Sequence, residues 1–306
     1  LRPGMTLSHF GGLKKFMSWN GALLTDSGGY QVFSLSERVS FLEEGVRFAS
    51  HLDGSLHLFT PRSVVDFQTV IGSDIMMVLD DCPPGHALDG RIDESLDRTH
   101  RWAREAALYR KELVDSGRIA PTKRLFGIIQ GAIRRDRRIQ SAGFIQSLPF
   151  DGIAIGGLSV GESREEMHEV LEWLSPELDP ARPHYLMGVG TIPDFLEAVR
   201  CGVDMFDCVI PTRNGRNGQI FTSKGRVNLR NASLAALETS PDPECSCRVC
   251  RRYSLGYLRH LFMSREMLGA QMATYHNLHF FHDFMKQMRR AIYENRFMEF
   301  YSRWKK

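Results

Sequence analysis

Two aspartates have the residue type and the setting for chemistry on a sugar. Asp207 interrupts an apolar run at 203–210, which predicts a buried strand. Asp26 follows the short apolar run 22–25 and precedes Ser-Gly-Gly. A carboxylate in such a run is costly unless it has partners or a chemical role. Paired carboxylates suit displacement at an anomeric carbon, where one attacks and the other moves protons. An aspartate before Ser-Gly-Gly is also a common turn residue, so the sequence alone leaves the role of Asp26 open.

A basic stretch follows Asp207. Residues 212–218 read Thr-Arg-Asn-Gly-Arg-Asn-Gly, a composition that predicts a mobile loop with affinity for polyanions. The formal net charge of the chain is only +3, so any basic surface must be local. A solvated surface is the alternative reading, but the position between Asp207 and a cysteine cluster favours phosphate contacts.

Three cysteines lie close together, at Cys245, Cys247 and Cys250. Three thiolates and one imidazole complete a closed, tetrahedral structural zinc site, for which we expect one ion per chain and no part in the chemistry. His276 is the expected fourth ligand, with His260, His279 and His282 as competitors; buried cysteines without metal are the alternative. Six cysteines in all, without the pattern of a disulfide framework, indicate a reducing compartment.

The elements that must position these residues repeat as strand, polar or Gly-rich end, helix. The repeat occurs six times up to Asp207, which predicts a parallel sheet. A doubly wound sheet and a (β/α)8 TIM barrel both fit. Six strand ends with polar or glycine residues favour the barrel, whose closed ring brings such ends to one mouth; they are Asp26, Asp80, Gln130, Gly156-Gly157, Met187-Gly188 and Asp207. Two barrel units are then missing, and the start at Leu1-Arg-Pro suggests that residues upstream are absent.

Local signals mark several boundaries. Residues 39–59 alternate around Asp53-Gly54 and predict a β-hairpin. Thr60-Pro61 predicts a helix start and Gly72 its end, and Ser163-x-x-Glu166 is a capping box. The domain prediction is a barrel region over 1–218, followed over 219–306 by two short strands, the zinc-binding subdomain and helices from 255 onward. No apolar run has the length of a membrane span.

Two sets of residues stay ambiguous without a family. Asp80-Asp81 has the look of a metal pair, but no His or Glu accompanies it at ligand spacing, so we favour a hydrogen-bonding role. Tyr30 and Met187 fit either the core or the two faces of a slot for a flat ligand.

Five strings together resemble the tRNA-guanine transglycosylase (queuine tRNA-ribosyltransferase) family, in order and over essentially the whole chain. They are Leu24-Thr-Asp-Ser-Gly-Gly-Tyr-Gln31, Phe126-Gly-Ile-Ile-Gln-Gly131, Gly156-Gly-Leu-Ser-Val-Gly-Glu162, the run from Phe206-Asp-Cys to Gly218, and the cysteine cluster. The resemblance implies a zinc-containing (β/α)8 barrel that exchanges guanine at wobble position 34 of tRNAs with GUN anticodons (Tyr, His, Asp, Asn), without ATP. It also implies a cytoplasmic enzyme and a homodimer.

Site roles carry over by motif. Asp207 matches the nucleophile that forms a covalent tRNA–enzyme intermediate, and Asp26 matches the general acid/base. The resemblance implies that the remaining matched residues bind the base: Asp80 at its N1 and 2-amino edge, Gln130 and the Gly157 N–H at its O6/N7 side, Tyr30 and Met187 on its two faces, and the Leu158 carbonyl at the substituent on position 7. The anticodon loop is expected on Thr212, Arg213, Asn214, Gly215 and Arg216.

Cys82 and Val160 resemble the bacterial forms of the family. Bulk at 160 should exclude the cyclopentenediol of queuine, so the expected incoming base is 7-aminomethyl-7-deazaguanine, with a eukaryotic-type enzyme using queuine as the alternative. A non-catalytic tRNA-binding subunit is a second alternative, disfavoured because Asp26 and Asp207 are both present. An archaeal-type enzyme acting on the D-arm and a metal-dependent barrel hydrolase fit less well. The first would bring an extra RNA-binding module, and the second a His-rich ligand set.

Overall fold

The computed structural model describes residue 4 and residues 6–29, 39–50 and 52–305. The chain forms two compact units. The first comprises Leu1–Val189 and Glu197–Phe206, and the second comprises Gly190–Leu196 and Asp207–Lys306. We describe each unit by itself. The predicted domains 1–218 and 219–306 have other bounds than these compact units. They stay a prediction.

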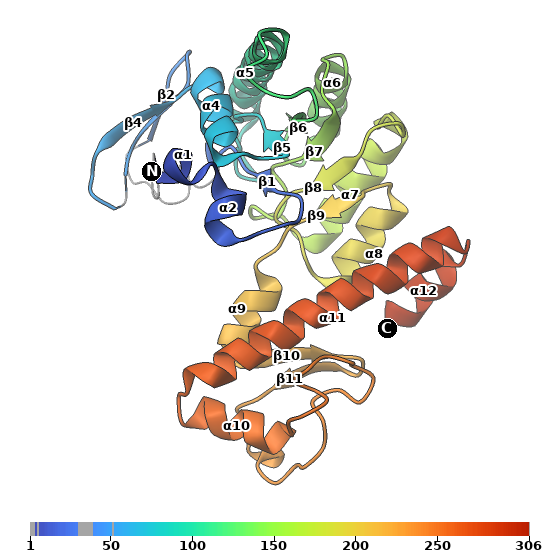
Figure 1. Cartoon of the computed structure of the whole chain (residues 1–306). Helices are drawn as coiled ribbons and strands as arrows, with labels where there is room; N and C mark the ends of the chain where they lie inside the picture. The colour runs from blue at the N-terminus through green and yellow to red at the C-terminus, as the bar shows by residue number, and fades with distance from the viewer. Residues whose placement is uncertain (1–3, 5, 30–38, 51, 306) are drawn as a thin grey trace. The chain divides into compact units, whose positions relative to one another are not determined.

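The first unit is built on a six-stranded parallel sheet that curls into a half-barrel (Figure 1). Its strands follow one another in space as they do along the chain. A doubly wound sheet reverses its strand order at a switch point, so the sequential order supports the barrel reading for these six strands. The strands in spatial order are β1 (Leu24–Thr25), β5 (Ile75–Met77), β6 (Arg124–Ile129), β7 (Gly152–Ile155), β8 (His184–Leu186) and β9 (Met205–Phe206).

Helices alternate with these strands, as the sequence predicts. The helices are α1 (Thr6–Phe10), α2 (Leu13–Met17), α4 (Pro61–Ile71), α5 (Asp89–Asp115), α6 (Arg135–Gln146), α7 (Arg164–Leu174) and α8 (Ile192–Arg200), with a short 3-10 turn at Ser175–Glu177. The helix α8 is shared, since its residues up to Leu196 fall in the second unit.

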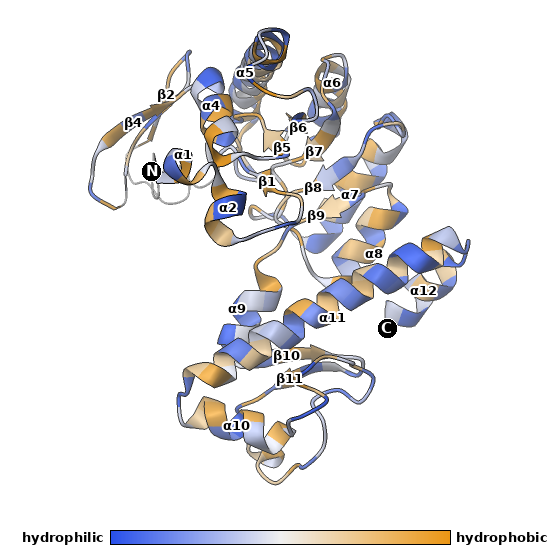
Figure 2. Cartoon of the chain, in the orientation of Figure 1, coloured by the Kyte–Doolittle hydropathy of each residue, from blue (hydrophilic) through white to orange (hydrophobic). Residues whose placement is uncertain are grey.

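The core of the first unit lies between the sheet and its helices. Strands β6 and β7 are buried almost throughout, as expected for a parallel sheet, whose two faces are both covered from solvent. The large apolar cluster joins strand residues such as Ile128 and Ile153 to Ala103 of α5 and Val170 of α7. Figure 2 shows the same arrangement as mainly orange strands beside helices that carry both orange and blue.

The predicted boundaries of α4 and α7 are confirmed. The Thr60 side chain accepts from the Ser63 N–H, Pro61 occupies the first turn, and Gly72 ends α4 at φ 82°. Ser163 and Glu166 form the predicted capping box of α7. The predicted hairpin at 39–59 is a three-stranded antiparallel sheet of β2 (Val39–Phe41), β3 (Val46–Ala49) and β4 (Leu56–Phe59).

The second unit has one long helix at its centre. The two predicted short strands are β10 (Gln219–Thr222) and β11 (Gly225–Asn228), which pair as an antiparallel hairpin with register Ile220↔Val227. The helices are α9 (Ile210–Arg216), α10 (Leu255–Met263), α11 (Met267–Tyr293) and α12 (Phe297–Trp304), with a 3-10 turn at Ala232–Leu234. Within the described ranges, no helix is long and apolar enough to cross a membrane.

Candidate functional site

The parallel strands of the first unit bring the predicted base-binding residues to one edge of the sheet. Asp26 follows β1, Asp80 lies beyond β5, Gln130 follows β6, and Gly156 and Gly157 follow β7. Because carboxyl ends of parallel strands share one edge, these residues converge. We call Asp26, Asp80, Gln130, Gly156 and Gly157 the strand-end cluster.

The centre of the strand-end cluster is a buried hydrogen bond between two side chains. Gln130 Nε2 donates to Asp80 Oδ2 at 2.6 Å, and both residues are almost fully buried. Burial is the main cause that raises the pKa of Asp80 to about 7, and the nearby charge of Asp26 raises it further. A carboxyl group in this environment is poised to change its charge near neutral pH.

The turn after β1 lies directly against Asp80. A Cβ added at Gly29 would lie 2.9 Å from the main-chain oxygen of Asp80 and 3.2 Å from its Oδ1, so only glycine permits this approach. Asp26 Oδ1 accepts from the Ser27 N–H at 2.7 Å. The Ser-Gly-Gly sequence after Asp26 is therefore part of how the two carboxyl groups are brought together.

Asp81, the neighbour of Asp80, is not a metal ligand in this arrangement. Its carboxylate is buried and forms ion pairs with Arg91 at 2.5 Å and with Arg98. Both guanidinium groups also lie over the ring of Phe41 from β2. Asp80 therefore belongs to the strand-end cluster, whereas Asp81 forms structural ion pairs with Arg91 and Arg98.

Several polar atoms in the strand-end cluster lack partners. Gln130 Oε1 is buried and has no hydrogen-bond partner among the described residues. In the same described part of the chain, the N–H groups of Gly157 and Leu158 donate to no acceptor, although both residues are buried. An unpaired buried polar group costs about 1–3 kcal/mol. These three atoms therefore indicate a ligand with donors and acceptors along its edge.

Other predicted residues lie near the same strand ends. Leu158 is buried after β7, and the Val160 carbonyl accepts from Gly85 N–H at 3.4 Å. Cys82 is buried two residues beyond Asp80, and burial raises the pKa of its thiol to about 12. Met187 follows β8, and its N–H donates to the Ile155 carbonyl at 3.2 Å. Tyr30 lies outside the described residues.

Asp207 directly follows β9 in sequence and belongs to the second unit, together with the predicted RNA-binding residues. Two expectations are wrong here: the strand covers Met205–Phe206 rather than the full apolar run, and the predicted loop after Pro211 is the helix α9. Pro211 lies in the first turn of α9, where its fixed φ favours a helix. Packing against α11 supplies the rest, because a Cβ added at Gly215 would lie 2.7 Å from Thr274 Cα.

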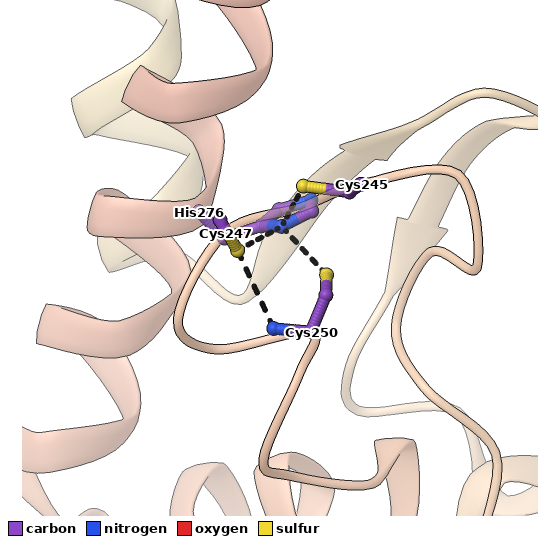
Figure 3. A group of neighbouring side chains, drawn as sticks. All are labelled: Cys245, Cys247, Cys250 and His276. Atoms are coloured by element: carbon purple, nitrogen blue, oxygen red, sulfur yellow. Dashed lines mark hydrogen bonds between the residues drawn. The ribbon is translucent and has the colours of Figure 1, made fainter.

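The predicted metal ligands come together in the second unit (Figure 3). One ligand atom from each of Cys245, Cys247, Cys250 and His276 lies within 4.8 Å of the others. His276 Nδ1 lies 3.8, 3.5 and 3.2 Å from the three sulfurs in chain order. A tetrahedral zinc ion bound by thiolate and imidazole requires a sulfur–nitrogen separation of about 3.6 Å. The donor set and its dimensions therefore fit a closed zinc site.

The hydrogen bond of the second ring nitrogen of His276 supports His276 as the fourth metal ligand over the other candidate histidines. His276 Nε2 lies 2.7 Å from the carbonyl oxygen of Phe221. Metal-ligating histidines usually donate their other ring N–H to such an acceptor, and here donation from Nε2–H leaves the Nδ1 lone pair facing the sulfurs. His279 Nδ1 approaches only Cys245, at 3.7 Å.

The sequence reasoning missed four buried polar residues that support these sites. Ser141 Oγ accepts from the Gln130 N–H at 3.2 Å and lies 3.1 Å from His100 Nε2. Burial lowers the pKa of His100 to about 4, so it is neutral near pH 7. Arg138 is fully buried beside Gly156 and Gly157, and Asn277 follows His276. A signal for Arg138 was present, since it shares a helical stripe with Ser141, Ala142 and Ile145.

Comparison with known proteins gives matches along the whole chain. The family model described as "Queuine tRNA-ribosyltransferase" matches residues 1–306. A queuine tRNA-ribosyltransferase of Leptospira biflexa is 53% identical over 306 residues, which is 100% of this chain and 81% of that protein. The corresponding protein of Desulforapulum autotrophicum is 48% identical over 301 residues, 98% of this chain and 80% of that protein. One of Solidesulfovibrio magneticus is 50% identical over 298 residues, 97% and 78% of the two chains.

Proposed function

The chain belongs to the queuine tRNA-ribosyltransferase family, and on that premise we propose that it is a tRNA-guanine transglycosylase. Its reaction exchanges guanine at the wobble position of tRNAs with GUN anticodons for 7-aminomethyl-7-deazaguanine. The observation that carries the base-binding part is the buried Asp80–Gln130 pair beside Asp26, with N–H groups at Gly157 and Leu158 that have no acceptor in the described part of the chain.

The proposed chemistry is a double displacement at the ribose anomeric carbon. The carboxylate of Asp207 attacks this carbon, and the glycosidic bond breaks with its electron pair leaving on guanine. Asp26 donates a proton to the departing base. The incoming base then loses a proton to Asp26 and displaces the Asp207 ester, so two inversions retain the configuration.

The strand-end cluster has the donors and acceptors that a guanine edge requires. An ionised Asp80 accepts from the N1–H and the 2-amino group. Gln130 Nε2 has a second hydrogen beyond the one given to Asp80, and this hydrogen and the Gly157 N–H suit O6 and N7. We propose the Leu158 carbonyl for the substituent at position 7, and Tyr30 and Met187 for the two faces of the base. The target nucleotide must leave its stack to enter such a slot.

The choice of incoming base rests on Cys82 and Val160. Both lie next to strand-end residues, and the bulk of Val160 argues against the larger cyclopentenediol substituent of queuine. Competition between 7-aminomethyl-7-deazaguanine and queuine for incorporation tests this assignment. Equal incorporation of the two bases by the wild-type protein would contradict the assignment. If Val160→Gly left the preference between the two bases unchanged, Val160 would not determine it.

The tRNA is proposed to contact the helix α9 through Thr212–Arg216 (residues 212–216). Arg213 and Arg216 lie in its last turn, where guanidinium groups suit phosphates of an anticodon loop. Replacing either arginine by glutamine should weaken tRNA binding and reduce the slope of log affinity against log salt by about 0.7. An unchanged slope would remove α9 from the phosphate contacts.

The zinc ion, when bound to the Cys3His cluster, supplies structural support rather than chemistry, because four protein ligands leave no open position. The chain's own residues then perform every step of the exchange. We further propose a homodimer and a cytoplasmic location, as expected for the family and its tRNA substrate.

Asp207→Asn tests the central proposal. The variant should lose exchange of labelled guanine and lose the covalent tRNA adduct seen on a denaturing gel, yet still bind tRNA. Asp283→Asn, a change of the same type at an exposed position of α11, serves as the matched control and should retain both. A covalent adduct in Asp207→Asn would assign the nucleophile elsewhere, and a wild-type protein that binds tRNA without exchange would be a binding subunit.

A further inference from the structure

Arg138 is a fully buried cation that forms no ion pair with a carboxylate among the described residues, although the charge of Glu162 acts on it from a greater distance. Its exposure is 0%, and no ion pair joins it to an acid among the residues that the structure describes. Burial lowers the pKa of its guanidinium only to about 10, so it stays charged near neutral pH. A buried charge of this kind is expensive unless hydrogen bonds compensate it.

Four main-chain carbonyls provide that compensation. Arg138 Nε donates to Ala132 O at 2.7 Å, and Nη1 donates to Ile129 O at 3.1 Å. Nη1 also donates to Gly156 O at 2.7 Å, and Nη2 donates to Gly157 O at 2.9 Å. The guanidinium thus joins the ends of β6 and β7, on either side of Gln130 and at the two glycines.

The two glycine bonds fix the direction of two donors. A trans peptide holds its C=O and N–H on opposite sides of a plane. The Gly156 carbonyl shares a peptide with the Gly157 N–H, and the Gly157 carbonyl shares one with the Leu158 N–H. Because both carbonyls point to Arg138, both N–H groups point away from it. These are the two N–H groups that have no acceptor within the described ranges.

A cation on the carbonyl side of a peptide also strengthens its N–H as a donor. Hydrogen bonds in series polarise one another, and the effect is larger where the local dielectric is low. Gly156, Gly157 and Leu158 are all buried. A Cβ added at Gly157 would lie 2.2 Å from Gln130 Oε1 and 3.5 Å from Arg138 Nη2, so the peptides are held between the guanidinium and the Gln130 amide.

From this geometry we propose that Arg138 is a positioning residue that orients and polarises the Gly157 and Leu158 N–H groups toward the O6/N7 side of the base. The inference rests on the proposed function and adds a source of electrostatic stabilisation to it. When the glycosidic bond breaks, negative charge spreads over the departing guanine, and part of it resides on O6. Oriented N–H donors stabilise such charge in the manner of an oxyanion hole. Arg138 itself does not touch the base.

Arg138→Met and Arg138→Lys test the proposal in the full chain. Both are compared by kcat and KM for exchange of labelled guanine, and by inhibition constants for guanine and 6-thioguanine. Sulfur at position 6 is a poor acceptor, but the N1 and 2-amino edge that faces Asp80 is the same in both bases. Loss of one neutral hydrogen bond corresponds to roughly fivefold in affinity.

The expected result is a selective loss. In Arg138→Met, kcat should fall by about tenfold or more, with KM for tRNA little changed, and the preference for guanine over 6-thioguanine should shrink by roughly fivefold. Arg138→Lys, which keeps the charge but has no planar fork, should fall between Arg138→Met and wild type. Arg135→Met, an exposed arginine on the same helix, is the matched control and should match wild type.

Three results would overturn the proposal. One is an equal rise of both inhibition constants with an unchanged ratio, which a purely structural role predicts. Another is an unaltered kcat. The third is failure of Arg138→Lys as well as Arg138→Met to fold, judged by circular dichroism and metal content, which would make Arg138 a stability residue. A wild-type protein without exchange activity would instead contradict the proposed function itself.

Discussion

The side-chain amide of Asn277 donates to the carbonyl oxygen of Pro211 at 2.9 Å. The same Nδ2 donates to Gln219 O at 2.9 Å, and Oδ1 accepts from Phe221 N–H at 3.0 Å. Asn277 is fully buried and directly follows His276. One turn of α11 therefore carries both a predicted zinc ligand and the connection to the first turn of α9.

Asn277→Leu should destabilise the second unit. The variant keeps the approximate size of the side chain but removes the Asn277 partner of the Gln219 carbonyl and the Phe221 N–H, and each buried main-chain group left unpaired costs about 1–3 kcal/mol. We expect a thermal unfolding midpoint lower by roughly 5 °C or more and weaker tRNA binding, with unchanged inhibition by free guanine. Gln287→Leu, on an exposed part of α11, is the control. An unchanged midpoint would mean that these hydrogen bonds contribute nothing to stability.

Metal removal should open the same region. His276 Nε2 connects the cluster to Phe221 of β10, and three thiolates repel one another once the cation is gone. A chelator should make Cys245, Cys247 and Cys250 reactive toward a thiol reagent and should weaken tRNA binding. Cobalt restored to the site should give the absorption of a tetrahedral thiolate complex, one ion per chain. Tight tRNA binding by metal-free protein would contradict the proposed structural role.

Gly215→Ala should separate α9 from α11. The added methyl group would lie 2.7 Å from both the Cα and the N of Thr274, and main-chain atoms of a helix cannot give way as a flexible side chain can. We expect tRNA affinity to fall by about tenfold or more, as for a strained core substitution of about 1–3 kcal/mol. Gly143→Ala, where nothing lies within 4 Å, should leave activity unchanged and stability equal or slightly higher. Equal behaviour of the two variants would rule out close packing at Gly215 as a requirement.

The pH dependence of base binding should follow Asp80. With its pKa near 7, affinity for guanine should increase about tenfold per pH unit below that value, as the carboxylate forms, and level off above it. Asp80→Asn should bind weakly without this dependence. Asp26→Asn should shift the midpoint to lower pH, because the charge of Asp26 is one cause of the raised pKa. If Asp26→Asn left the midpoint unchanged, the charge of Asp26 would have no effect on the pKa of Asp80.

The same shift has a consequence for stability with the opposite sign. A carboxyl group whose pKa is higher in the folded state holds its proton more tightly there. Its contribution to stability is therefore complete below the unfolded pKa of about 4 and is lost as pH rises through about 7. In the absence of a base, unfolding measurements should show Asp80→Asn to be less sensitive than wild type over this interval.

The sequence predicts most of the strand-end cluster because its members share a simple rule. Asp26, Asp80, Gln130 and Gly157 each follow a short apolar run, and parallel strands bring such positions together. The boundaries of α4 were predictable for a similar reason, since Thr60 and Gly72 have well-defined preferences at helix ends. These are local signals, and the structure confirms their local meaning.

What the sequence does not reveal depends on contacts between distant segments. Gly215 and Asn214 favour a loop by propensity, but α11, which lies some sixty residues further on, stabilises a helix there. The helical stripe that Arg138 shares with Ser141, Ala142 and Ile145 indicates a buried position. It does not indicate the role of Arg138, because its four carbonyl partners are main-chain atoms that no residue type specifies. The sequence likewise does not indicate the roles of Ser141 and His100, because the contacts of Ser141 with the Gln130 N–H and with His100 form only in the folded chain. Residues that act through the backbone of others leave little trace in composition or spacing.

The division of the chain into two units bears on how the protein is made. The polypeptide leaves the first unit after Val189, returns to it at Glu197 and leaves it again after Phe206. During synthesis, the first unit therefore cannot be completed until the segment ending at Phe206 has emerged from the ribosome. By then the segment Gly190–Leu196 of the second unit has already been synthesised. The ring contacts of Phe195 with Phe281 and Phe284 can form only after α11 has been synthesised. A nascent chain arrested shortly after Phe206 should expose this aromatic side chain, and a single protease cut in the finished protein cannot release either unit intact.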